Sequence, residues 1–171
     1  MQLRPSSEDY PKYYETYVRL VPEGPIEETL RQQQKETMTF LKSISETETE
    51  NAYAPGKWTI KEVVGHITDI ERVMSYRLFA IARGEDKSLL GMDENVYVSS
   101  ANFNQFGWER LITDLSTTRS STLSLMTTID DTSWVRKGAM LDVPVKPYAL
   151  AYILAGHELH HLNIIKERYL K

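Results

Sequence analysis

The chain has 171 residues and a mass of 19.8 kDa; 41% of its residues are hydrophobic and 26% are charged, and its formal net charge is −4. This size and composition predict one globular domain over residues 1–171 and exclude a disordered chain. The acidic balance, with a pI near 5.6, gives no basic surface for nucleic acid, and no apolar run reaches the roughly 18 to 20 residues of a membrane span.

The amino terminus and the absence of cysteine narrow the chemistry further. The first residues, MQLRPSSEDYPKYY, lack the apolar centre of a signal peptide, so we expect a cytoplasmic protein without a membrane partner. With no cysteine, the chain has no disulfide, thiolate metal site or cysteine nucleophile. Any metal must therefore be bound by imidazole or oxygen, and any thiol chemistry must use an external thiol.

The first predicted element is a short amphipathic helical segment over residues 8–20. Its tyrosines recur at helical spacing, at Tyr10, Tyr13, Tyr14 and Tyr17. Packing against the core is the expected role, and covering one end of the core is the alternative.

Two long helices follow. The first should begin at Pro25, after Gly24, and end near Ser45. A capping box formed by Thr59 and Glu62 starts the second, which should end before Gly84. The apolar residues at helical intervals are Ile26, Leu30, Met38, Leu41 and Ile44 in the first helix, and Ile60, Val63, Ile67, Ile70, Met74 and Leu78 in the second.

The second half of the chain predicts two more helices separated by long loops. Residues 85–103 are predicted to form a long connection, which would let neighbouring helices run parallel. A third helix is predicted from Gln105 to Ile129. Residues 130–146 should form a loop with a small hairpin, and Pro147 should open a last helix that runs almost to the end. Four helices of about 20 residues, each with one apolar stripe, predict an all-α four-helix bundle.

The histidines carry the strongest chemical signal. His157 and His161 are four residues apart, so their rings lie one turn apart on one side of the last helix. His66 lies beside Val63 and Ile70 on the apolar stripe of the second helix and should also point inward. Three inward imidazoles from two helices predict a site for one divalent metal ion, with open positions for water or substrate.

Separate hydrogen-bonded core histidines are the alternative to a metal site. His160 is about 100° around the helix from His161, so it could support the site, lie at the rim of a pocket or be exposed. Asp69, about one turn after His66, could orient that ring or be a solvated charge.

His157 to His161 also match the H-E-x-x-H motif, in which Glu158 would be the general base of a zinc protease. The downstream glycine and histidine of one protease class are replaced by Ile164 and Glu167, and too little chain follows for the other class. Glu158 should also face away from the metal. Glu158 and His160 therefore remain only candidates for a catalytic role.

Several motifs together resemble the DinB superfamily, also called the DinB or YfiT-like metalloenzymes. Trp58 and His66 are separated by seven residues, and Gly-His-Glu-Leu-His-His occurs near the carboxyl end. The similar segments are Gly56 to Arg72, Tyr76-Arg77, Ala82 to Gly84 and Ala155 to Tyr169.

This resemblance implies a four-helix bundle, often a homodimer, in which His66, His157 and His161 bind nickel, zinc or a related ion such as iron or manganese. Relatives include thiol S-transferases that use bacillithiol, mycothiol or glutathione-like cosubstrates, and others are labelled metal-dependent hydrolases from fold alone. The leading hypothesis is an enzyme that activates a low-molecular-weight thiol or water for attack on an electrophilic small-molecule substrate. A non-catalytic, metal-binding or dimerising stress-related protein is the alternative.

Three further residues are candidates for the wall of a pocket or for binding an anion: Trp58, Tyr152 and Arg77. Aromatic core packing for the first two and an exposed cation for Arg77 are the expected roles.

Overall fold

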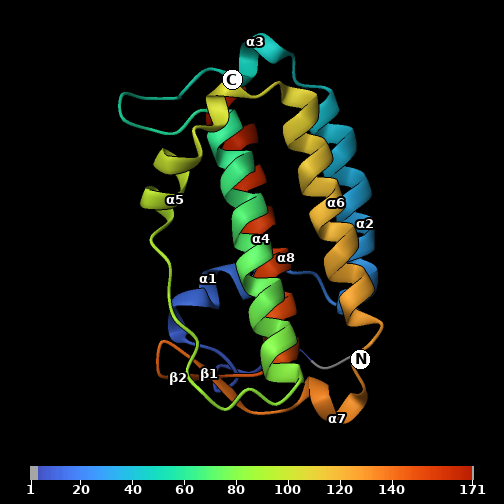
Figure 1. Cartoon of the computed structure of the whole chain (residues 1–171). Helices are drawn as coiled ribbons and strands as arrows, with labels where there is room; N and C mark the ends of the chain where they lie inside the picture. The colour runs from blue at the N-terminus through green and yellow to red at the C-terminus, as the bar shows by residue number, and fades with distance from the viewer. Residues whose placement is uncertain (1–3, 171) are drawn as a thin grey trace.

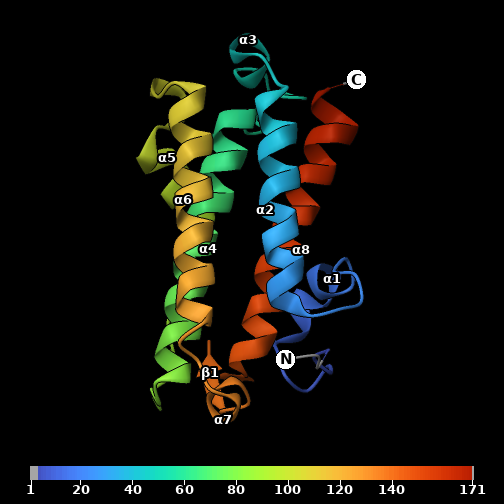
Figure 2. The ribbon, with the colours of Figure 1, turned by 90° about the vertical axis from the view of Figure 1, so that its right-hand side faces the viewer.

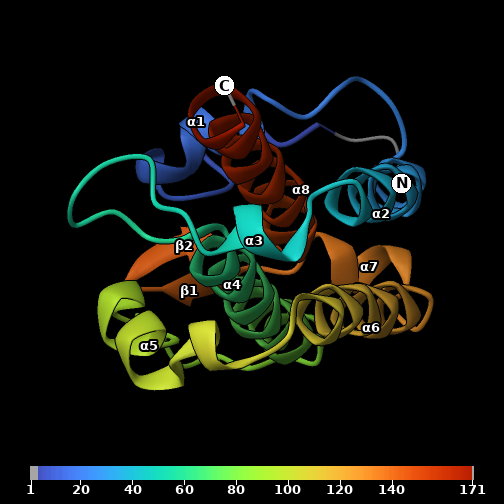
Figure 3. The same ribbon diagram turned by 90° about the horizontal axis from the view of Figure 1, so that it is seen from above.

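The computed structural model describes residues 4–170 and confirms the four-helix bundle (Figures 1 and 2). Its long helices are α2 (Ile26–Lys42), α4 (Ile60–Ala82), α6 (Trp108–Met126) and α8 (Pro147–Ile164). Seen from above, they pack in the circular order α2, α6, α4 and α8 (Figure 3). The neighbours α4 and α6 run in the same direction, so their connection must travel back along the bundle (Figure 1).

Local signals account for most of the helix boundaries. The backbone N–H of Thr59 donates to the Glu62 carboxylate over 2.8 Å, and the Thr59 hydroxyl accepts from the Glu62 N–H over 3.2 Å. This is the predicted capping box of α4. Gly84, with a φ of +98°, follows the end of the helix in the left-handed region that glycine tolerates.

The structure corrects the predicted connection over residues 85–103. It contains the helix α5 (Glu94–Ala101), and a 3-10 turn (Phe103–Gln105) follows. The side chain of Asp93 caps α5 by accepting from the N–H groups of Asn95 and Val96. Sequence periodicity missed α5 because Val98 is its one buried residue, so the helix has no apolar stripe.

The other boundaries differ by a few residues. α6 begins at Trp108 and ends at Met126, inside the predicted range, and α8 passes into a π-helical turn (Ile165–Tyr169). The predicted hairpin is confirmed as β1 (Gly138–Met140) paired with β2 (Val143–Val145). The remaining short elements are a 3-10 turn (Lys12–Tyr14), α1 (Glu15–Val18), α3 (Glu46–Thr49) and α7 (Asp131–Trp134).

A polar layer crosses the middle of the bundle between two apolar clusters. Every long helix contributes apolar residues to both clusters and carries polar or charged residues between them. The layer contains the site histidines and a group of buried residues beside them: Gln33, Thr37, Glu71, Arg119 and Glu158. Among the helices of residues 4–170, none is long and apolar enough to cross a membrane.

Candidate metal centre

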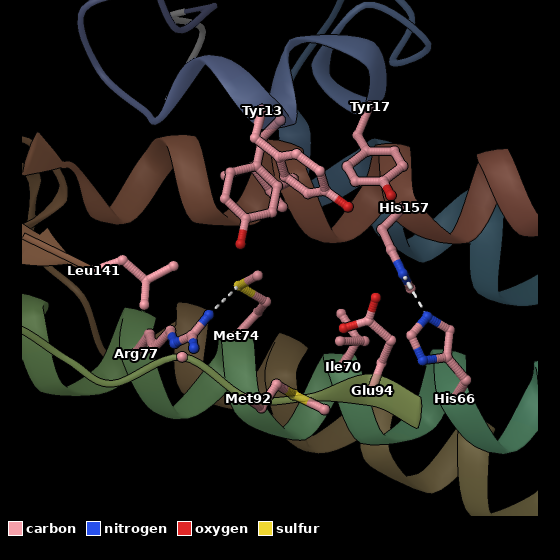
Figure 4. Close-up of a pocket in the computed structure, with 13 residues that line it drawn as sticks. Tyr13, Tyr17, His66, Ile70, Met74, Arg77, Met92, Glu94, Leu141 and His157 are labelled. Carbon is pink, nitrogen blue, oxygen red and sulfur yellow. Dashed lines mark hydrogen bonds between the residues drawn. The ribbon is translucent and has the colours of Figure 1, made fainter. Parts of the chain in front are cut away.

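Three histidine rings meet between α4 and α8, as predicted. The ring centroids of His66, His157 and His161 lie 4.5 to 4.9 Å apart. Their ligand nitrogens all lie within 4.8 Å of one another, and the Nε2 atoms of His66 and His157 are 3.1 Å apart (Figure 4). His66 and His157 are buried, and His161 is partly exposed.

Burial keeps these rings neutral. It lowers the pKa of His66 to about 4, and burial together with the neighbouring imidazoles lowers the pKa of His161 to about 3. The pKa of His157 falls well below its usual value for the same two reasons. At neutral pH each ring therefore has a nitrogen lone pair that can bind a cation.

The geometry fits an imidazole-bound divalent ion. Two nitrogens that bind one tetrahedral ion at about 2.0 to 2.1 Å lie roughly 3.3 Å apart, close to the 3.1 Å between His66 and His157. The other nitrogen of His66, Nδ1, is buried without a hydrogen-bond partner, so no protein group orients the ring through that atom. Nitrogen ligands without thiolates suit zinc, nickel and iron.

Two neighbours of the cluster are placed at its edge. Asp69 is partly buried and forms an ion pair with Arg72 over 3.2 Å, and the Nδ1 atom of His66 has no hydrogen-bond partner, so Asp69 does not orient that ring. His160 is partly exposed; its ring centroid is 5.1 Å from that of His161 and 5.3 Å from that of Tyr17. His160 therefore lies at the rim of the cluster.

Glu158 belongs to the buried polar group and not to the histidine cluster. Its carboxylate accepts a hydrogen bond from Thr37 and forms an ion pair with Arg119, which also binds Glu71 over 2.6 and 2.8 Å. Burial raises the pKa of Glu158, although Arg119 opposes that shift. These partners occupy the carboxylate that a zinc protease would need at its metal.

A cavity of about 110 Å³ opens from His66 and His157 (Figure 4). Tyrosines of the amino-terminal segment form one wall, so this segment flanks the site as well as packing on α8. Arg77 lines the same cavity with 3% of its surface exposed, and the prediction of an exposed cation was wrong. Other residues that line this cavity are Tyr13, Tyr14, Tyr17, Ile70, Met74, Glu94 and Ile153.

A second cavity, of about 270 Å³, reaches the cluster at His161. Trp58 lines it, and its ring centroid is 4.9 Å from that of His66, so Trp58 is a wall residue. Tyr152, in contrast, is buried in the apolar core, as expected.

Sequence reasoning missed Glu94. This residue is the first of α5, and its carboxylate lies near the His66 end of the 110 Å³ cavity (Figure 4). The cap residue Asp93 is a signal that could have located the helix. The approach of Glu94 to the histidines depends on how the connection folds across α4.

A helical bundle with an internal three-imidazole cluster defines a class of metal-binding bundle proteins. Residues 29–165 match the model of the DinB superfamily, and the chain belongs to that superfamily.

Among solved structures, the chain is similar to YfiT from Bacillus subtilis, described as "a probable metal-dependent hydrolase with an unusual four-helix bundle topology". The TM-score is 0.70 and the sequence identity 15%, over 97% of this chain and 91% of that chain. This likeness supports the fold. No curated protein shows a significant sequence match.

Proposed function

We propose that this protein is a metal-dependent enzyme that activates a small thiol or water for attack on an electrophilic substrate. One observation carries the proposal: three neutral imidazoles converge at a point that opens into a lined cavity. His66, His157 and His161 would hold nickel or zinc, with iron or manganese as further candidates. Such an ion, when bound, lowers the pKa of a coordinated thiol or water so that it is a nucleophile at neutral pH.

The chain's own residues supply the remaining parts of a reaction site. Glu94 is the carboxylate that lines the 110 Å³ cavity among residues 4–170, and it would accept the proton from the nucleophile. Ile70, Met74 and Ile153 give that cavity apolar walls that limit access of bulk water. A general base beside the cluster favours an enzyme over a non-catalytic, dimerising stress-related protein.

The two cavities favour a thiol S-transferase. A transferase must hold two organic molecules at one centre, whereas a hydrolase holds one together with water. One cavity opens at His66 and His157 and the other at His161, so each of two substrates would occupy a separate cavity beside the cluster. A hydrolase is the second candidate, because YfiT is described as "a probable metal-dependent hydrolase". We also propose a homodimer.

Metal analysis followed by a conjugation assay tests the proposal. The protein is loaded with nickel or zinc and mixed with glutathione and monobromobimane; the sulfur–carbon bond forms, bromide leaves and the thiol proton passes to Glu94. A rate above that of the uncatalysed reaction is expected. Replacing Glu94→Gln should lower kcat roughly 100-fold or more while metal content stays the same.

The His157→Ala variant should lose both the metal and the turnover. Release of p-nitrophenol from p-nitrophenyl acetate without added thiol would favour the hydrolase. Bound metal without turnover over a broad panel of thiols, esters and electrophiles would contradict an enzyme and support the non-catalytic protein.

A further inference from the structure

Arg77 is a buried cation that forms no direct ion pair with a carboxylate of residues 4–170, although Glu94 lines the same cavity nearer the histidines. Its side chain is 3% exposed, and among residues 4–170 it forms no ion pair with aspartate or glutamate. One Nη donates to the Leu90 carbonyl over 2.6 Å, and the other contacts the sulfurs of Met74 and Met140 at 3.5 and 2.9 Å. Thioether sulfur is a weak acceptor, so much of the charge is left without compensation.

Arg119 is a second buried arginine of the same bundle, and its charge is balanced. It is 1% exposed, and two carboxylates, those of Glu71 and Glu158, pair with it directly. Arg77 lines the 110 Å³ cavity, whereas the void beside Arg119 measures only about 10 Å³. A buried charge normally requires a partner, so the contrast points to an anion that enters the cavity from outside.

Arg77 and the histidines lie at the two ends of one cavity. His66, Ile70, Met74 and Arg77 follow one another on successive turns of α4 and all line it (Figure 4). Eleven residues of helix correspond to roughly 16 Å between the first and last Cα atoms. The wall between the two ends contains the apolar side chains of Ile70, Met74 and Ile153. Tyr14 lines the same cavity and interacts with Arg77, and burial raises the pKa of this tyrosine.

We propose that Arg77 binds an anionic group of the substrate, a carboxylate or an oxyanion of similar size, at the end of the cavity remote from the histidines. The substrate class is an elongated molecule with an anionic head and an apolar middle. That its other end reacts at the histidines rests on the function proposed above. Two parallel N–H groups of a guanidinium match the two oxygens of a carboxylate.

The rival explanation is that Arg77 only anchors the connection around Leu90 through its hydrogen bond to that carbonyl. An anchoring residue would stabilise the fold without any preference for anions. Binding of short ligands that carry or lack the charge separates the two roles.

Isothermal titration calorimetry with butanoate and with its neutral analogue butanamide tests the proposal. Both probes are too short to span the cavity, and the protein is used both free of metal and loaded with zinc. We expect wild type to bind butanoate roughly 10- to 100-fold more tightly than butanamide in both states, as for other hydrogen bonds to charged groups. Arg77→Met should abolish that preference, and Arg77→Lys should retain part of it.

Arg83→Met is the matched control, because Arg83 is an exposed arginine near the end of the same helix. It should keep the full preference. Equal binding of the two probes to wild type, or butanoate binding that requires zinc and survives Arg77→Met, would overturn the proposal. If Arg77→Met does not fold, wild type and Arg77→Lys decide the outcome. The titration of metal-free protein does not depend on turnover. A failed conjugation assay would therefore contradict the proposed enzyme function without contradicting anion binding at Arg77.

Discussion

His157 and His160 are three residues apart on α8, but only His157 belongs to the three-histidine cluster. Both lie on α8, but only His157 faces His66 across the bundle. His160 is partly exposed, makes an edge contact with the ring of Tyr17 and is not part of the three-histidine cluster. The two positions therefore provide a matched pair of substitutions.

Replacing His157→Ala should weaken metal binding by more than the roughly 10- to 100-fold typical for loss of a residue that only supports a ligand. His160→Ala should leave the metal stoichiometry unchanged. Metal content after dialysis, measured by inductively coupled plasma mass spectrometry, checks both. Equal loss of metal in the two variants would contradict the three-histidine assignment.

Arg119 balances two buried carboxylates at the level of the histidines. Arg119→Met should lower the free energy of unfolding by about 3 to 5 kcal/mol, because it leaves Glu71 and Glu158 buried without a counter-ion. Glu158→Gln should lower the free energy of unfolding by less, because Arg119 still forms its ion pair with Glu71. Urea unfolding followed by circular dichroism measures both changes.

Arg31→Met is the control for the loss of an arginine, because its ion pair with Glu27 is exposed and should contribute only about 0.5 kcal/mol or less. Glu158→Gln should also retain the bound metal. Loss of turnover per folded molecule in Glu158→Gln, with metal retained, would instead revive Glu158 as a general base.

At the scale of elements, α1 and α8 approach so closely that only glycine fits between them. A Cβ added at Gly156 would lie 2.0 Å from the backbone oxygen of Tyr17. This contact holds the tyrosine segment against the helix that carries His157, with the rings of Tyr17 and His157 5.3 Å apart. The wall of the cavity therefore depends on one small residue.

Gly156→Ala should lower the free energy of unfolding by about 1 to 3 kcal/mol because α1 must move away from α8. Helix propensity alone would favour alanine by about 1 kcal/mol, so the sign of the change separates the two effects. Asn163→Ala, at an exposed position of α8, should cause no loss. Urea unfolding of both variants checks this, and a more stable Gly156→Ala protein would contradict the close contact.

At the scale of the whole molecule, the amino-terminal segment is tied to the start of α8 through Asp9. The buried carboxylate of Asp9 accepts from the hydroxyl of Tyr148 over 2.6 Å and pairs with Lys146 over 2.6 Å. Burial raises the pKa of Asp9, but the hydrogen bonds from Lys146, Tyr148 and Ser6 outweigh it and hold the pKa well below the ordinary value. Folding thus favours the ionised carboxylate.

Because the pKa of Asp9 is lower in the folded state, its contribution to stability is complete above the unfolded value, near pH 4, and is lost as the pH falls below it. Asp9→Asn should lower the free energy of unfolding at pH 7 by about 1.5 to 3 kcal/mol. It should also flatten the decline in stability between about pH 4 and pH 2. Thermal unfolding over that range measures the effect, and Asp86→Asn, at an exposed loop position, should keep the wild-type slope.

The sequence by itself determined the four long helices and the pairing of His157 with His161. Helical periodicity, the capping box at Thr59 and the glycine at position 84 act within a few residues, so they can be recognised without knowing the fold. The inward direction of His66 followed from the same periodicity, because Val63 and Ile70 share its face.

Only the tertiary structure decided what surrounds the histidines. Glu94 reaches the cavity because a helix without an apolar stripe folds across α4, and the tyrosine segment forms a wall because Gly156 allows close packing. Arg77 is buried because Met140 and the backbone around Leu90 fold over it, and neither supplies a carboxylate. Such contacts depend on how the helices pack together, and local sequence patterns do not encode them.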